Sequence, residues 1–318
     1  MSTEVCVVDG DWTRTKRLTP WYDDGNVVLV AADCSALYRV HRGILCSYSS
    51  IFRDMFTASC GGPEEIERCP VVHLTDSAED LQHVLRAFYD RSYCSSSDDE
   101  VPIAVVAAFL RLGKKYDIPH LFQEAKSRMV ADFPSSFTAF HSGLTENWKV
   151  TSPWEVTLSK DIIFAMINLA REMDFHVVLP AAYYMCLGYC SLEEILTGAR
   201  DETGEVVQVL SPEARQTCAL ATEPFWSLSN ETFSFLRIEC DTQSISCADA
   251  TKDFLLRCFF PVSTVAPLDD IPEDVMADLC EVCALRASES HQTNRVAVWN
   301  RLPGIFGLPD WDKIREYA

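Results

Sequence analysis

Four cysteines in the second half of the chain have a spacing that could bind a metal ion. Cys280 and Cys283 form a Cys-x-x-Cys pair, and Cys240 and Cys247 precede it with six residues between them. Four thiolates around one Zn²⁺ ion are a common structural site. Such sites usually carry two tight pairs on turns, however, and this Cys-x-x-Cys pair lies in a segment with a helical pattern. The spacing leaves two interpretations open, a zinc site and a set of reduced cysteines in the core.

The chain shows no recognisable pattern of a catalytic site. Its 318 residues include only 12 Gly, and no glycine-rich phosphate loop, Gly-x-Ser-x-Gly or His-Glu-x-x-His sequence occurs. His41 precedes a predicted helix and could serve as an acid or base. We favour a partly buried imidazole that hydrogen-bonds the backbone and holds the strand-to-helix turn. We therefore expect no catalytic residue and no cofactor apart from the zinc candidate, an unrecognised active site in the second half being the alternative.

A serine cluster is a candidate for phosphorylation. Ser95, Ser96 and Ser97 each have an acidic residue three positions later, a pattern that acidophilic kinases accept. Phosphate groups there would add negative charge beside the helix predicted to begin near Pro102, and would alter docking at that helix. A solvated loop without modification is the other interpretation.

Charge excludes some classes of partner. The chain has 27 Lys+Arg and 47 Asp+Glu, a net charge of −20, and residues 134–318 hold 13 basic and 27 acidic residues. A nucleic-acid binding surface needs clustered positive charge, so we expect no nucleic-acid partner. The longest apolar run, 102–110, is far shorter than the roughly 20 residues of a membrane helix. Because residues 1–20 do not resemble a signal peptide, we expect an intracellular protein of the cytoplasm or nucleus, with its 14 Cys reduced.

The first part of the chain predicts a small sheet flanked by helices. Apolar runs at 27–30 and 36–40 suggest a hairpin, and 71–74 suggests a third strand. Ser49 is a candidate cap for the next helix, and Asp76 with Glu79 for a capping box. The segment 102–116 is apolar on nearly all faces, as in a buried helix, and Pro119 suits the first turn of a helix running to about Asp132.

The second part predicts helices only. Ser159 and Pro180 are placed to begin two helices, and Ser191 with Glu194 has the spacing of a capping box. Ser211-Pro212 is placed to begin a fourth helix, and a second box, Asp270 with Glu273, brackets Pro272. A domain boundary near 133/134 follows, where Pro134 and small polar residues come after a helical pattern.

Six segments of the chain carry a resemblance to a known family. Three occur in the first part, 38–45 (YRVHRGIL), 49–56 (SSIFRDMF) and 109–119 (FLRLGKKYDIP), and in this order they resemble a BTB/POZ domain. Three occur in the second part, 167–172 (INLARE), 179–184 (LPAAYY) and 299–309 (WNRLPGIFGLP), and they resemble the helical extension found in an expanded set of fungal BTB proteins. The resemblance implies an α+β fold with a lead segment at 1–23, a BTB/POZ domain at 24–133 and an all-α domain at 134–318.

The resemblance also implies a function in protein–protein interaction. BTB relatives often recruit cullin-type ubiquitin ligases through the segment 49–57 and the loop after the helix that ends near Tyr89. This resemblance points to Met55, Phe56 and Arg42 as partner-binding residues. The motif residues His41, Asp117 and Pro119 are expected to be structural. Transcription-factor relatives pair a basic residue at Arg42 with an acidic residue where this chain has Asn26, a departure from the corepressor-binding pocket.

We therefore expect a non-enzymatic adaptor, and recruitment of a cullin-type ubiquitin ligase is one role that it could have. The alternative is a nuclear transcriptional co-regulator that does not bind DNA directly. Swapped BTB dimers use an N-terminal helix and strand, and the segment preceding Val27 is short and only weakly apolar. A monomer or a weak homodimer is the expected state.

Overall fold

The computed structural model describes residues 15–32, 34–58, 64–90, 93, 101–143, 159–237, 239–240, 245–260 and 265–316. The chain divides into two compact units, here called the sheet unit (1–131 with 153–156) and the helical unit (132–152 with 157–318). The division between Ala131 and Asp132 lies two residues before the boundary expected at 133/134.

The sheet unit is built on a five-stranded mixed sheet with the order β1-β3-β2-β5-β4. Its strands are β1 (Lys16–Trp21), β2 (Val27–Val30), β3 (Ala36–Val40), β4 (Glu65–Ile66) and β5 (Cys69–His73). The predicted hairpin is confirmed, because β2 and β3 pair antiparallel with Val27 opposite Val40. Every residue of β2 is buried, which explains its uninterrupted apolar run.

Strand β1 lies in the segment expected to lead into the domain, and it pairs parallel with β3. This strand was not predicted, because an edge strand such as β1 keeps most of its side chains in contact with solvent. Lys16–Trp21 therefore carries two basic residues and no apolar run.

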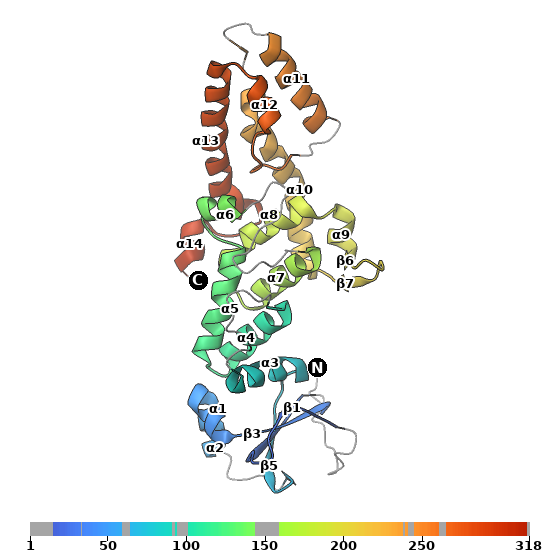
Figure 1. The fold of residues 1–318 in the computed structure, drawn as a ribbon, viewed down its shortest axis with the longest axis vertical. Helices are drawn as coiled ribbons and strands as arrows, with labels where there is room; N and C mark the ends of the chain where they lie inside the picture. Colours follow the sequence, from blue (N-terminus) through green and yellow to red (C-terminus); the bar gives the residue numbers. More distant parts are fainter. Residues whose placement is uncertain are drawn as a thin grey trace. The chain divides into compact units, whose positions relative to one another are not determined.

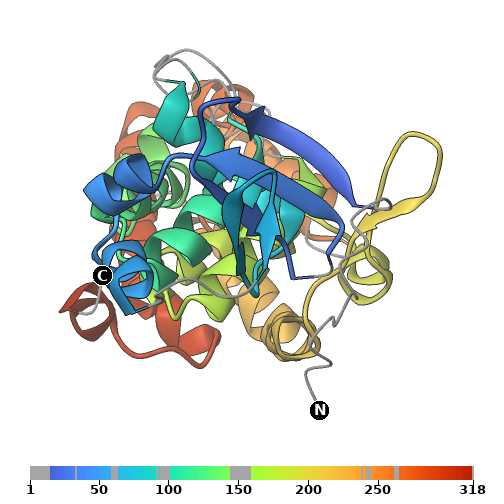
Figure 2. The same cartoon turned by 90° about the horizontal axis from the view of Figure 1, so that it is seen from below.

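Five helices complete the sheet unit: α1 (Arg42–Tyr48), α2 (Ser50–Ala58), α3 (Ala78–Tyr89), α4 (Ile103–Lys115) and α5 (Pro119–Asp132). Helix α3 lies between the sheet and α4 (Figure 1). Helices α1 and α2 lie beside the sheet rather than over it (Figure 2). As predicted, α4 is largely buried, with seven of its residues inside the unit.

Two serines begin helices of this unit, and only one was expected. The prediction for Ser49 is confirmed, since its hydroxyl accepts a hydrogen bond from the Phe52 N–H at 3.0 Å. The predicted box of Asp76 with Glu79 is wrong, because Ser77 is the cap of α3 and accepts from the Asp80 N–H at 3.0 Å. Asp76 is drawn away by tertiary partners: it pairs with the Lys115 ammonium at 2.6 Å and accepts a hydrogen bond from the Tyr116 hydroxyl.

Among its described residues, the helical unit contains helices and one small hairpin. Its α-helices are α6 (Phe137–Gly143), α7 (Lys160–Glu172), α8 (Leu179–Tyr189), α9 (Leu192–Thr197), α10 (Pro212–Thr232), α11 (Ile245–Phe259), α12 (Glu273–Asp278), α13 (Glu281–Ile305) and α14 (Trp311–Glu316). Short 3-10 turns are η2 (His176–Val178) and η3 (Ser234–Arg237), and the antiparallel hairpin is β6 (Ala199–Arg200) with β7 (Val206–Gln208). The hairpin is a departure from the all-helical expectation, and its strand β7 comes from the β-branched run Val206-Val207.

Most of the predicted helix starts in this unit are confirmed. Ser191 and Glu194 form both hydrogen bonds of a capping box at α9, and the Ser211 hydroxyl accepts from the Ala214 N–H at the start of α10. Helix α8, which carries Pro180 in its first turn, is the centre of the unit: all residues from Leu179 to Leu187 are buried, and the helix packs against α7, α10 and α13. No described helix is long and apolar enough to cross a membrane.

The segment formed by η3, α11, α12 and the first half of α13 is here called the terminal lobe. Figure 1 shows α11 and α12 beside this half of α13. The lobe has a small apolar core of its own, made of Phe233, Phe235, Leu236, Phe254, Val275 and Ala287. Seven partly buried apolar side chains pack against these six: Leu255, Cys258, Phe259, Val265, Ile271, Met276 and Leu279.

His291 is buried against this core, with its ring centroid 4.8 Å from that of Phe233. Burial, reinforced by the positive charge of Arg295, lowers the pKa of His291 from 6.5 to about 4. The unfolded chain therefore binds a proton that the folded chain excludes as the pH falls below 6.5. Replacing His291 by glutamine removes this penalty.

When the pH is lowered from 7 to 5, we expect the free energy of unfolding of the wild type to fall by about 2 kcal/mol more than that of His291→Gln. The reason is that each pH unit between the unfolded pKa of 6.5 and the folded pKa of about 4 costs about 1.4 kcal/mol. Urea unfolding at several pH values measures the difference. Other titrating groups, including Asp269, whose pKa burial raises to about 8, are present in both proteins and largely cancel. Two pH profiles that run parallel would contradict the prediction.

Candidate functional site

The turn from β3 into α1 is held by an aromatic cluster around His41. The Tyr89 hydroxyl accepts a hydrogen bond from the His41 backbone N–H at 2.8 Å and lies 3.1 Å from its Nδ1. The ring Nε2 lies 3.3 Å from a carboxylate oxygen of Asp24, and Tyr22 packs on both His41 and Tyr89. The imidazole was expected to bond the backbone, but its contacts are with side chains: Tyr89 links the turn to the end of α3, and Asp24 links it to the segment between β1 and β2.

Arg42 is directed at the end of α2. Its guanidinium lies over the Phe56 ring, 4.9 Å from the centroid, and donates a hydrogen bond to the Phe56 carbonyl at 2.9 Å. The backbone N–H of Arg42 donates to the Asn26 side chain at 2.8 Å. The Asn26 side chain therefore bonds the Arg42 backbone rather than its guanidinium. The guanidinium is directed at the carboxyl end of α2, where its positive charge offsets the negative end of the helix dipole.

The apolar face of α2 is divided between the core and the surface. Phe52 is buried and stacks on Tyr116 with 4.4 Å between ring centroids. Phe56, expected to bind a partner, is only 7% exposed and packs inside the unit. Met55 is half-buried, and Ile51 is 41% exposed. Ile51 and Met55 are four residues apart and share one side of the helix.

Tyr48 extends this exposed apolar region onto α1. Its side chain is 41% exposed, and its ring stacks on Phe88 of α3 at 4.7 Å and lies 5.1 Å from the ring of His120 on α5. Burial lowers the pKa of His120, which favours its neutral form. Tyr48, Ile51 and Met55 are here called the α1–α2 surface. Sequence analysis did not name Tyr48 or Ile51 as partner-binding residues, because a helical pattern alone does not show which apolar side chains the neighbouring helices leave uncovered.

Asp117 and Pro119 shape the turn between α4 and α5 that supports α2. Asp117 has a left-handed backbone (φ 50°), which Asp tolerates better than most residues, and its carboxylate accepts from the Ser50 hydroxyl at 2.6 Å. Pro119 is the first residue of α5. Gly113 permits the close crossing, because a Cβ there would lie 3.0 Å from the Phe122 backbone nitrogen. The turn that contains Asp117 and Pro119 therefore supports the N-terminal end of α2 and, with it, the α1–α2 surface.

The helical unit holds the four cysteines at one place. The Sγ atoms of Cys240, Cys247, Cys280 and Cys283 all lie within 4.8 Å of one another. The Cys-x-x-Cys pair was expected inside a helix, but the structure places it at the start of one: Cys280 is the N-cap of α13 and Cys283 lies in the first turn.

Serines 95, 96 and 97, the candidate phosphorylation sites, lie outside the described residues.

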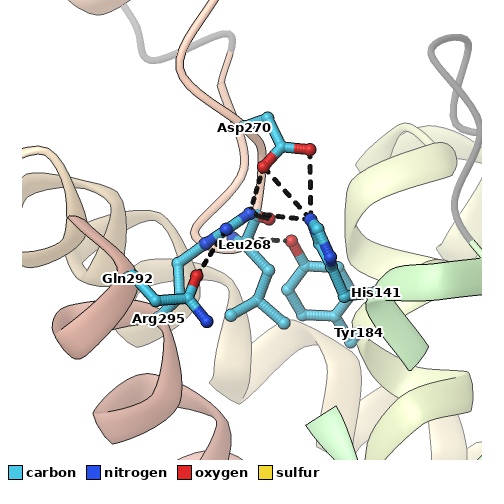
Figure 3. A network of polar contacts seen from close by, with 6 residues as sticks. All are labelled: His141, Tyr184, Leu268, Asp270, Gln292 and Arg295. Atoms are coloured by element: carbon cyan, nitrogen blue, oxygen red, sulfur yellow. Dashed lines mark hydrogen bonds and ion pairs between the residues drawn. The ribbon is translucent and has the colours of Figure 1, made fainter. Parts of the chain in front are cut away.

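A polar network joins α6, the loop before α12 and α13 (Figure 3). Arg295 donates to Gln292 at 2.7 Å and pairs with Asp270, whose two carboxylate oxygens each lie 3.1 Å from His141 Nε2. In the same network the Tyr184 hydroxyl accepts from the Leu268 N–H at 2.9 Å. The expected capping box of Asp270 with Glu273 is therefore wrong: Pro272 is the N-cap of α12, and Asp270 turns to Arg295.

The pKa values in the network reflect a competition between burial and charge. Burial opposes the ionisation of Asp270, but the charges of Arg295 and His141 outweigh it and lower the pKa of the carboxyl group. The negative charge of Asp270 is thus balanced by partners within the network. The residues of the network hold together α6, the loop before α12 and α13, which indicates a structural role.

Residues 23–132 match the BTB/POZ domain family. The match agrees to within one residue at each end with the range expected from the sequence, and it covers the sheet from β2 onward together with α1 to α5. No curated protein matches the chain. The sheet unit thus contains a BTB/POZ domain, which is a protein–protein interaction module, and the helical region follows it.

Proposed function

We propose that this protein is a non-enzymatic adaptor whose BTB/POZ domain recruits a cullin-type scaffold through the α1–α2 surface. The observation that carries the proposal is the pair of large apolar side chains, Tyr48 and Ile51, left 41% exposed on a domain of an interaction family. Large apolar side chains at the centre of a contact supply most of the binding energy of such interfaces.

The surroundings of these side chains suit an interface. Arg53 and Asp54 of α2 are exposed beside Ile51, as is usual for the polar rim around an apolar centre. The rigidity of the α1–α2 surface comes from the buried Phe52–Tyr116 stack and from the Ser50–Asp117 hydrogen bond beneath it. A preformed surface lowers the entropic cost of binding.

The helical unit would present a second surface to another partner. It holds most of the excess negative charge, with 13 basic and 27 acidic residues between 134 and 318. Complementary charge favours a partner with a basic or neutral surface. The adaptor would thus join a scaffold, bound by the BTB/POZ domain, to a protein bound by the helical unit.

Ile51→Ala/Met55→Ala is expected to weaken binding of the full-length chain to a purified cullin N-terminal domain by about tenfold or more, because it removes two apolar contacts from the interface. Isothermal titration calorimetry measures the effect. Val130→Ala is the matched control, since Val130 is a similarly exposed apolar residue on α5 of the same unit, and this variant should bind like the wild type.

Failure of the wild-type chain to bind, or equal binding by both variants, would overturn the cullin proposal.

Light scattering of the same preparation tests the oligomeric state. Because β1 already pairs with β3 of its own chain, we propose a monomer or a weak homodimer. A tight dimer at micromolar concentration would refute this second statement without affecting the first.

A further inference from the structure

The four clustered thiols of the terminal lobe are arranged like the ligands of one metal ion. Their Sγ atoms lie within 4.8 Å of one another, and those of Cys240 and Cys280 are 3.9 Å apart. Four sulfur ligands at about 2.3 Å from zinc in a tetrahedron are about 3.8 Å from each other. We propose that Cys240, Cys247, Cys280 and Cys283 bind a single structural Zn²⁺ ion.

Disulfides do not account for the cluster. A disulfide holds its sulfur atoms at about 2.05 Å, whereas none of these four described cysteines forms a disulfide and the Sγ atoms of Cys240 and Cys280 are 3.9 Å apart. A core of reduced thiols does not account for it either. The apolar core of the lobe consists of six other side chains, and the four cysteines are not among the described residues packed against it. Three of the four are only half-buried, which is unusual for thiols that act as small hydrophobic groups.

The backbone around the cluster positions the sulfur atoms. Cys280 has the extended conformation of an N-cap (φ −66°, ψ 156°), so Cys280 and Cys283 lie on the turn that opens α13. This arrangement is the tight pair on a turn that structural zinc sites usually contain. The Cys280 N–H donates a hydrogen bond to the Cys247 sulfur at 3.0 Å. Hydrogen bonds of this kind orient metal ligands.

The ion would join three segments of the lobe. Cys240 follows η3, Cys247 lies near the start of α11, and the other two open α13. Besides the apolar core that these elements share, described polar links between α11 and the α12 region include the Arg257–Asp274 ion pair at 2.9 Å and the hydrogen bond from the Ser246 hydroxyl to the Asp278 carbonyl at 2.6 Å. Because the unfolded chain offers no preformed site, metal binding would add directly to the stability of the lobe.

The test uses the full-length chain purified under reducing conditions from zinc-supplemented culture. Elemental analysis by mass spectrometry is expected to find one zinc per chain in the wild type and in Cys258→Ser, a control cysteine of the same lobe. Cys283→Ser is expected to lose at least about tenfold in zinc affinity, because a hydroxyl is a poor ligand beside thiolates. Zinc that stays bound with unchanged affinity in Cys283→Ser would place the metal elsewhere and overturn the proposal.

A second measurement needs no variant, so it stands even if Cys283→Ser fails to fold. Cobalt added to the metal-free wild-type chain should give the visible bands of tetrahedral cobalt and the charge-transfer absorption of thiolate ligands. Alkylation followed by peptide mass spectrometry should show the four cysteines protected with zinc and reactive after chelation, while Cys46 of the sheet unit reacts equally in both states. Absence of zinc with no cobalt spectrum, or an alkylation pattern unaffected by the chelator, would show that the thiols are reduced core residues.

Discussion

Trp299→Ala is expected to lower the free energy of unfolding of the helical unit by about 3–5 kcal/mol, the range for deleting a buried Trp side chain. Trp299 is 2% exposed, stacks on Trp311 with 5.2 Å between ring centroids and packs on Phe140 at 4.8 Å. Its indole N–H has no hydrogen-bond partner among the described residues, so the loss comes from the cavity that the ring leaves behind.

Urea unfolding followed by far-UV circular dichroism measures this loss as a shift of the transition that belongs to the helical unit. Leu220→Ala, at an exposed position of α10 in the same unit, is the control and should change stability by less than about 0.5 kcal/mol. The Trp311 indole bonds to the Trp299 backbone carbonyl, a contact that the substitution keeps. A loss below about 1 kcal/mol would show that the site collapses around the missing ring.

Asp270→Asn is expected to destabilise the helical unit by about 2–3 kcal/mol, since it removes the carboxylate that neutralises Arg295. Arg295 is buried, with its side chain 7% exposed, and pairs with Asp270 and hydrogen-bonds Gln292 (Figure 3). Breaking a fully buried pair costs more, but the Asp270 side chain is 69% exposed, and water compensates part of the loss.

The double variant Asp270→Asn/Arg295→Met distinguishes an unpaired charge from lost packing. Methionine keeps an apolar side chain of similar length and removes the buried guanidinium, which lies over the Phe137 ring, so the double variant should be more stable than Asp270→Asn alone. Urea unfolding of the two single variants, the double variant and the wild type completes the cycle. A double variant as unstable as the sum of the single variants would indicate that the two residues act independently.

The BTB/POZ domain could be located from the sequence because its evidence is local. The hairpin of β2 and β3 follows from two apolar runs that are close in the chain. Ser49 directly precedes α2 and accepts a hydrogen bond from an N–H only three residues further on. The capping box of Ser191 with Glu194 is local in the same way. Each of these features depends on residues within a few positions of one another, so propensity and spacing are enough to find it.

The errors arose where a distant partner competed with a local one. Asp76 was expected to cap α3, but it bonds to Lys115 and Tyr116, and Ser77 takes its place. Asp270 was expected to cap α12, but it pairs with Arg295. A carboxylate that can neutralise a buried or partly buried charge gains more than one that bonds a single helix N–H in water, and the distant partner cannot be identified from spacing.

The class of the first unit, the helical character of the second and the residue types of a metal site can all be derived from the amino-acid sequence. Which of those residues come into contact depends on the tertiary fold. It buries Phe56 and leaves Tyr48 and Ile51 exposed, and it brings Cys240 and Cys280 to 3.9 Å although 39 residues separate them in the chain. The physical reason is that caps and periodicity are local properties of the chain, whereas burial and ligand geometry depend on how whole elements pack against one another.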